Sequence, residues 1–210
     1  MTLWKDNAKE IAGFIAEKDI DTFKEWLVVR RSMVICGAEW VNLEYPLVYA
    51  HGYKECYANP TELHQAYHLC HLHTPVEKRS HVVEIGAGYG ALATVVLNTG
   101  FSGSYTIFDI PEVIRIQKHV LKGKPVTWAK SSVEIQPNTV AMSFWSISEI
   151  PVRLRRRYIK MIQQADEYLI AFQEEFEGID NKAYFKENLG GEIASMPHIH
   201  GSYYMRGGKE

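Results

Sequence analysis

The feature that most constrains the fold is the run at residues 81–93, which reads HVVEIGAGYGALA. A short stretch rich in β-branched residues leads into alternating glycines, and these lead into residues that favour a helix. Glycine adopts positive φ without strain and, lacking Cβ, lets a bound molecule approach the backbone closely. This order of strand, tight turn and helix is typical of an open, mostly parallel α/β sheet. It predicts a nucleotide-like cofactor at the edge where the strands end.

The nature of that cofactor is indicated by Glu84, which lies inside the apolar strand two residues before the first glycine. A buried carboxylate requires a partner, and it would repel the pyrophosphate of a dinucleotide. The α-ammonium group of S-adenosylmethionine would instead pair with it. The glycine spacing alone leaves both cofactors open, because Gly86, Gly88 and Ala91 also satisfy the looser dinucleotide pattern. The carboxylate therefore favours the methyl donor.

A second strand is expected at residues 104–109, where an alternating run ends in Asp109. The acid that binds a ribose is expected about 20 residues after the glycines, which is where Asp109 lies. Pro111 would then begin the next helix. The alternative role for Asp109 is to cap that helix.

Two motifs are similar to those of the S-adenosylmethionine-dependent methyltransferases of the Rossmann-like class, namely Glu84-Ile-Gly86-Ala-Gly88-Tyr-Gly90 and Phe108-Asp109-Ile110-Pro111-Glu112-Val113. The likeness is strongest to sugar O-methyltransferases and covers roughly residues 80–205. It implies S-adenosylmethionine as the cofactor. It also implies a doubly wound, mostly parallel seven-stranded sheet in the order 3-2-1-4-5-7-6, whose seventh strand returns antiparallel. It says much less about the acceptor.

In this fold class the cofactor lies along the ends of several strands. The strand expected at residues 125–129 would end beside the adenine, where Trp128 either stacks on the ring or packs against helices. Ser131 is a candidate hydrogen-bonding partner there, and Trp145 ends the buried strand expected at residues 139–145. The predicted cofactor-binding residues are Glu84, Gly86, Ala87, Gly88, Tyr89, Gly90, Asp109, Ile110, Trp128, Ser131 and Trp145.

Glu149 is the first candidate for a catalytic residue. It belongs to Ser146-Ile-Ser148-Glu149-Ile-Pro151, which resembles a Ser-Leu-Ser-Glu-Met run of the sugar methyltransferase-like family. Glu149 is predicted to orient an acceptor hydroxyl or a catalytic histidine. The alternative is that it serves as a favourable acid ahead of the helix expected at residues 151–165. The arginines of that helix are expected on a solvated face; they are Arg153, Arg155, Arg156 and Arg157.

His198 and His200 are the candidates for the catalytic base. They lie between the strands expected at residues 192–196 and 202–205, and the implied topology brings this turn to the edge that carries the glycines. Imidazole is suited to removing a hydroxyl proton near neutral pH. The alternative is that both are polar residues of an exposed turn.

The chain has 210 residues, enough for one sizeable core with an extension. We expect an N-terminal helical extension at residues 1–78, covering the substrate side, and a cofactor-binding domain at residues 79–210. The net charge of −2 gives no attraction to nucleic acid or an anionic membrane, and no apolar run reaches membrane-spanning length. We therefore expect a cytoplasmic enzyme with a small-molecule acceptor, no metal, and no nucleic-acid or membrane partner. Self-association stays open.

Two other classes of function stay open. An NAD(P)-dependent oxidoreductase would use the looser glycine pattern, but the chain has no Tyr-x-x-x-Lys for hydride transfer. A non-catalytic module that binds S-adenosylmethionine would be expected to have lost Glu84 or Asp109, and both are present.

Overall fold

The computed structural model describes residues 65, 68–196 and 199–209, and these belong to two compact units. The first, which we call the sheet unit, comprises Lys78–Ala87, Ser102–Ile110 and the described residues from Pro125 onward. The second, the helix unit, comprises Gly88–Phe101 and Pro111–Lys124 with the described residues up to Glu77. Each unit is described by itself.

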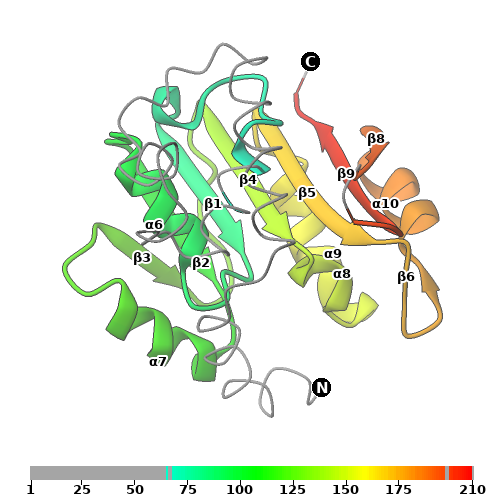
Figure 1. Ribbon diagram of the computed structural model, residues 1–210, viewed down its shortest axis with the longest axis horizontal. Helices are drawn as coiled ribbons and strands as arrows, with labels where there is room; N and C mark the ends of the chain where they lie inside the picture. Colours follow the sequence, from blue (N-terminus) through cyan, green and yellow to red (C-terminus); the bar gives the residue numbers. More distant parts are fainter. Residues whose placement is uncertain (1–64, 66–67, 197–198, 210) are drawn as a thin grey trace, which may run out of the picture. The chain divides into compact units, whose positions relative to one another are not determined.

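The sheet unit is built on a seven-stranded sheet in the order β3-β2-β1-β4-β5-β9-β8. Strands β1 to β5 are parallel, and β9 is antiparallel to both β5 and β8. Figure 1 shows β9 beside β5, running in the opposite direction. The predicted order, with its antiparallel last strand, is therefore confirmed. The strands are β1 (His81–Ile85), β2 (Ser104–Phe108), β3 (Val126–Ala129), β4 (Thr139–Phe144), β5 (Glu167–Gln173), β8 (Glu192–Ser195) and β9 (Ser202–Gly207).

The central strands are buried on both faces. Every residue of β1 and β4 is buried, as expected for apolar runs in a parallel sheet that is covered on two sides. One face of the sheet joins helices of the same unit in a continuous apolar core. That core includes Val83, Ile85, Phe108, Ala141, Ile147, Tyr158, Ile159, Ile162, Phe172 and Phe185.

Three helices of the sheet unit follow strands β4 and β5: α8 (Ser146–Glu149), α9 (Val152–Ile162) and α10 (Asn181–Leu189). One expectation for α9 was wrong. Arg153, Arg156 and Arg157 are exposed as expected, but Arg155 is only 1% exposed. The helix turns Arg155 toward the buried side, together with Tyr158, Ile159 and Ile162.

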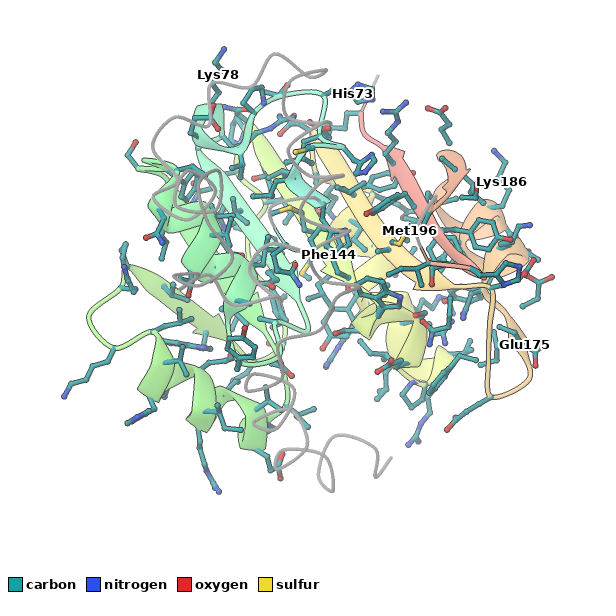
Figure 2. The ribbon with its side chains drawn as sticks, in the orientation of Figure 1. His73, Lys78, Phe144, Glu175, Lys186 and Met196 are labelled. Carbon is teal, nitrogen blue, oxygen red and sulfur yellow. The ribbon has the colours of Figure 1, made fainter. Side chains whose placement is uncertain are left out.

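A two-stranded hairpin, β6 (Glu175–Phe176) and β7 (Ile179–Asp180), lies between β5 and α10 and was not predicted. Its turn residues, Glu177 and Gly178, both have positive φ, as the favoured two-residue hairpin turns require. Figure 2 labels Glu175 on this hairpin.

The helix unit contains α6 (Ala91–Asn98) and α7 (Pro111–Val120). Gly90, at the N-terminus of α6, has φ of 100°, and a Cβ there would lie 2.8 Å from Leu121 Cδ1. The Gln117 side-chain amide donates to the Gly88 carbonyl at 2.8 Å. The positive φ and the close contact with Leu121 explain why glycine occupies position 90, directly before the predicted helix.

Much of the predicted N-terminal extension at residues 1–78 lies outside the described residues, so the extension and the boundary at residue 78 stay predictions. The short 3-10 helix η2 (Val76–Lys78) precedes β1. Among the helices that the structure describes, none combines the length and the apolar character needed to cross a membrane.

Asp180 caps the N-terminus of α10, because its Oδ1 accepts a hydrogen bond from the Ala183 backbone N–H at 2.9 Å. Asp180→Ala should therefore lower the free energy of unfolding by about 1 kcal/mol. Urea denaturation of the variant measures this loss. Glu187→Ala, an exposed change within the same helix, is the control and should leave stability nearly unchanged. Equal stability of both variants would contradict the capping role.

Candidate functional site

The candidate site of the sheet unit lies where the parallel strands end. The loops that follow β1, β2, β4 and β5 leave the sheet at the same edge, because those strands run in one direction. These segments begin at Gly86, Asp109, Trp145 and Glu174, respectively, and the one after β4 continues into α8. Phe144, labelled in Figure 2, marks the end of β4.

Gly86 lies in the tightest part of this edge. Its backbone N–H donates to the Phe108 carbonyl at 2.7 Å, and its carbonyl accepts from Ser146 Oγ at 2.9 Å. Its φ is 74°, and a Cβ added there would lie 2.1 Å from Ser146 Cβ. Both the backbone conformation and the lack of space therefore require glycine at this position.

Asp109 ties the end of β2 to the glycine turn. Its Oδ2 accepts from the Ala87 backbone N–H at 3.0 Å, and its Oδ1 accepts from the Ile110 backbone N–H at 2.8 Å. The alternative role of Asp109, capping the following helix, does not account for its hydrogen bond with the glycine turn. Next to Asp109, Ile110 exposes 40% of its surface and offers an apolar contact for a ring.

Glu84 is 4% exposed, and its Oε2 accepts a hydrogen bond from the Tyr105 hydroxyl at 2.7 Å. Burial raises the pKa of Glu84 to about 8; the Tyr105 hydrogen bond opposes this rise, and the negative charge of Asp109 adds to it. Burial and the Glu84 charge raise the pKa of Tyr105 well above its usual value, so Tyr105 remains a hydrogen-bond donor. A cation beside Glu84 would offset the cost of ionising it.

Trp128 lies in register with Ile107 on β2, which in turn lies in register with Glu84 on β1. Paired residues of neighbouring parallel strands share a face of the sheet, so these three residues form one row. Trp128 is half-buried, and Ser131 is exposed in the segment after β3. Their predicted roles at the adenine stay predictions.

The loop between β4 and α8 begins at Trp145, whose φ of 60° is unusual for a residue other than glycine. The loop is held on both sides. The Trp145 N–H donates to the Ala171 carbonyl at 2.6 Å, and Ser143 Oγ donates to the Ile85 carbonyl at 2.7 Å while accepting from the Ile147 N–H at 3.1 Å. Strained backbone held in this way is often found at functional sites.

Glu149 is half-buried and is the last residue of α8. The alternative reading, a first-turn acid of the next helix, was wrong. That helix begins at Val152, has Pro151 at its N-cap, and carries no acid in its first turn. The predicted catalytic role of Glu149 stays a prediction.

The turn between β8 and β9 lies beside the end of β5, because the Glu174 N–H donates to the Gly201 carbonyl at 2.8 Å. This is the edge expected from the implied topology. His200 is exposed in this turn, and His198 lies outside the described residues. The role of either histidine as a base stays a prediction.

Three predicted cofactor residues belong to the helix unit. Gly88 has φ of 53°, and within the part of the chain that the structure describes nothing lies within 4 Å of its missing Cβ; Tyr89 is half-buried. Gly90 is fixed by its contact with Leu121. Their contacts with a cofactor stay predictions. Within the described residues, no three histidine, cysteine or acidic side chains are grouped as a metal ion would require.

The sequence reasoning missed several residues that shape the site, namely Tyr105, Ser143, Ser146 and Arg155. A hydroxyl within the apolar strand β4 was a signal for Ser143, because a buried hydroxyl needs a partner. Tyr105 and Ser146 depend on contacts between segments far apart in the chain. Arg155 binds nearby backbone carbonyls, which no sequence pattern marks.

Comparison with known proteins identifies the fold. No protein-family model matches the chain, and no curated protein matches it in sequence. An O-methyltransferase family protein from Burkholderia thailandensis is similar in structure, with a TM-score of 0.51 and 12% identity over 65% of this chain and 53% of that one. The match thus spans about half the length of that protein.

Two further solved structures are similar to the same extent. A protein from Thermoplasma acidophilum has a TM-score of 0.51 and 15% identity, covering 69% of this chain and 87% of that one. A protein from Pyrococcus horikoshii has a TM-score of 0.51 and 10% identity, covering 64% and 84%. Together with the strand order, these matches define the fold as the Rossmann-like one of methyltransferases.

Proposed function

We propose that this protein is an S-adenosylmethionine-dependent methyltransferase. The buried carboxyl group of Glu84 is the observation that carries the proposal. It lies on the strand next to the one that ends at Asp109, and its ionised form would be stabilised by an ammonium group and repelled by the pyrophosphate of a dinucleotide. The α-ammonium group of the methyl donor would pair with Glu84. The ribose hydroxyls would bind Asp109, and the adenine would cover the exposed side chain of Ile110.

The acceptor that we propose is a sugar or another small hydroxylated molecule, bound beside the loop at residues 145–149. Two observations support this. The sequence of this loop resembles the Ser-Leu-Ser-Glu-Met segment of the sugar methyltransferase-like family, and an O-methyltransferase family protein has a similar fold. When bound, the cofactor supplies an electrophilic methyl group. The chain's own part is to align the acceptor oxygen with that methyl and to take up the hydroxyl proton.

The proposed step is a direct displacement. A bound S-adenosylmethionine would supply its methyl group to the acceptor oxygen, so that the oxygen–carbon bond would form as the sulfur–carbon bond breaks and S-adenosylhomocysteine would be the leaving group. The hydroxyl proton passes to a base, for which His198 and His200 are the candidates. Glu149 orients the acceptor or the base. No redox partner is needed, because the sulfonium takes back the electron pair of the broken bond.

Calorimetry tests the cofactor. S-adenosylmethionine and S-adenosylhomocysteine should bind with dissociation constants in the micromolar range, and Asp109→Ala should weaken both at least about tenfold, since it removes the proposed ribose acceptor. Glu175→Ala, at an exposed acid of the hairpin, is the control and should bind normally. Binding of NADH without any response to S-adenosylmethionine would overturn the proposal in favour of an oxidoreductase.

A screen tests the acceptor. Nucleotide sugars, free glycosides and small phenols are each incubated with the protein and S-adenosylmethionine, and release of S-adenosylhomocysteine is measured. Turnover with a sugar would support the proposed sugar acceptor. Turnover only with phenols would show that the acceptor is a phenol instead. Tight cofactor binding without turnover in any class would indicate a non-catalytic binding module.

A further inference from the structure

Arg155 is an unusual residue for the middle of α9, because its neighbours Arg153, Arg156 and Arg157 are exposed whereas it is 1% exposed. Burying a guanidinium is costly unless its donors are satisfied. Burial lowers the pKa of Arg155, but from a value so high that the group stays charged. Such a residue needs an explanation other than a solvated helix face.

The guanidinium binds the backbone on both sides of Glu149. Its Nη2 donates to the Ser148 carbonyl and its Nε donates to the Ile150 carbonyl. These carbonyls belong to the end of α8 and the residue after it, where carbonyl groups lack partners within the helix. Because the planar guanidinium has donors in fixed directions, it holds both peptide groups in one relative orientation.

A second set of contacts fixes Arg155 itself. Its Nη1 donates to Asn181 Oδ1 at 2.7 Å, and Asn181 Nδ2 donates to the Gln173 carbonyl at 3.0 Å. The guanidinium carbon also lies 5.1 Å from the centre of the Tyr184 ring and 5.8 Å from that of Phe185. Through these contacts the end of β5 and the start of α10 determine where the guanidinium lies.

The Ser148 side chain completes the link to β5. Its Oγ lies 2.5 Å from the Trp145 carbonyl oxygen and 2.8 Å from the Gln173 side-chain amide. One hydroxyl proton satisfies only one acceptor, so both contacts are favourable when the amide presents its NH₂ group. The loop at residues 145–150 thus has a residue with positive φ, Trp145, at one end and the buried guanidinium of Arg155 at the other.

We propose that Arg155 is a positioning residue, which holds the loop at residues 145–150 in one conformation and thereby sets where the Glu149 side chain lies. The part that concerns Glu149 rests on the proposed function, whereas the effect on the loop does not. A buried cation among neutral partners contributes little to stability relative to an apolar side chain, so its use is better explained by conformational specificity.

The test compares Arg155→Lys with Arg153→Lys, the same change at an exposed position of α9. Lysine keeps the charge but cannot bind two carbonyls in a fixed geometry. Hydrogen exchange of the Ser148 and Ile150 amides, which donate to Trp145 and Ser146, should become at least about tenfold faster in Arg155→Lys only. Unchanged exchange of these amides would overturn the proposal.

Fluorine NMR of the protein labelled with 5-fluorotryptophan separates positioning from mere stabilisation. Well below the unfolding temperature, the Trp145 resonance should shift or broaden in Arg155→Lys, while that of Trp128 stays fixed. A lower melting temperature with an unchanged Trp145 resonance would show a structural role alone. If Arg155→Lys does not fold, Asn181→Ala undergoes the same two measurements with the same expected direction. This change removes the acceptor of Arg155 Nη1 and the link from Asn181 to the Gln173 carbonyl, but leaves the two backbone contacts of the guanidinium in place.

The consequence for catalysis is measured with an acceptor from the screen. Arg155→Lys should lower kcat about 10- to 100-fold while KM for S-adenosylmethionine changes less than about threefold, since Glu84 and Asp109, the proposed partners of its ammonium and ribose groups, lie outside the loop. If Arg155→Lys kept the wild-type kcat although hydrogen exchange and the Trp145 resonance showed a disturbed loop, the link to Glu149 would be refuted. Failure of the wild-type protein to bind S-adenosylmethionine would refute the proposed function and leave the loop measurements valid.

Discussion

Gly86→Ala should abolish binding of S-adenosylmethionine, with a loss of at least about 100-fold in affinity. The added methyl group would lie 2.1 Å from Ser146 Cβ and 2.4 Å from its Oγ, far inside the contact distance of two carbon atoms. The φ of 74° is also unfavourable for alanine. The turn and the loop after β4 must therefore move apart, and this displaces Ala87 from Asp109. Calorimetry with S-adenosylhomocysteine measures the loss.

The matched control is Gly190→Ala. Gly190 ends α10 with the same φ of 74°, but among the described residues no atom beyond its chain neighbours and the backbone of its own helix lies within 4 Å of the position of its missing Cβ. The strain of positive φ is thus common to both variants, and only Gly86→Ala adds the collision. Both should lose about 1 kcal/mol or more of stability, but Gly190→Ala should bind the cofactor normally. Equal affinities in the two variants would show that the space beside Gly86 is irrelevant to binding.

Affinity for S-adenosylhomocysteine should rise about tenfold or more between pH 6 and pH 7.5, because its ammonium group pairs only with the ionised form of Glu84. The pKa of Glu84 is about 8 in the ligand-free chain, so the carboxyl group is mostly protonated below that pH. The groups that face it are Tyr105, which donates to it, and Asp109, whose charge opposes its ionisation. Above pH 8 the affinity should fall again, as the ligand's own ammonium group loses its proton.

Binding near pH 7 should release close to one proton. Calorimetry in two buffers with different heats of ionisation measures this number directly. Glu84→Gln should bind more weakly and release no proton, while Glu175→Gln should behave as wild type. A proton release of zero in the wild-type protein would contradict the pairing of Glu84 with the ammonium group.

The same shift predicts how stability depends on pH without ligand. The pKa of Glu84 is higher in the folded chain than the ordinary value of 4.5, so the folded state favours the protonated form. Its contribution to stability is complete below about pH 4.5 and is lost as the pH rises through about 8. Glu84→Gln should lack this loss and should therefore be the more stable form at pH 9.

The sequence predicted the fold where local patterns determine the structure. The run at residues 81–93 has a strand, a turn and a helix in the expected places, because β-branched residues, glycines and alanines each favour one of these. Asp109 was identified by its distance from the glycines. The strand order came from the resemblance, since no local pattern specifies which strands become neighbours.

The missed features depend on contacts that no spacing encodes. The hydrogen bond from Tyr105 to Glu84 requires β1 and β2 to pair in one register. Arg155 was wrongly expected on the exposed face of its helix. Two of its three hydrogen-bond acceptors are backbone carbonyls, and these cannot be recognised from residue types. The four-residue helix α8 is too short for a periodic pattern, and the Glu177-Gly178 turn is not one of the dipeptides that signal a hairpin.

The contact between Gly86 and Ser146 also has a consequence for how this chain tolerates evolutionary change. The Ser146 side chain fills the space that a Cβ at position 86 would need, so neither position evolves independently of the other. A larger residue at position 146 would press on a backbone that has no side chain to withdraw, and alanine at position 86 could be accommodated only beside glycine. Among homologues, these two positions should therefore vary together, although 60 residues separate them in sequence.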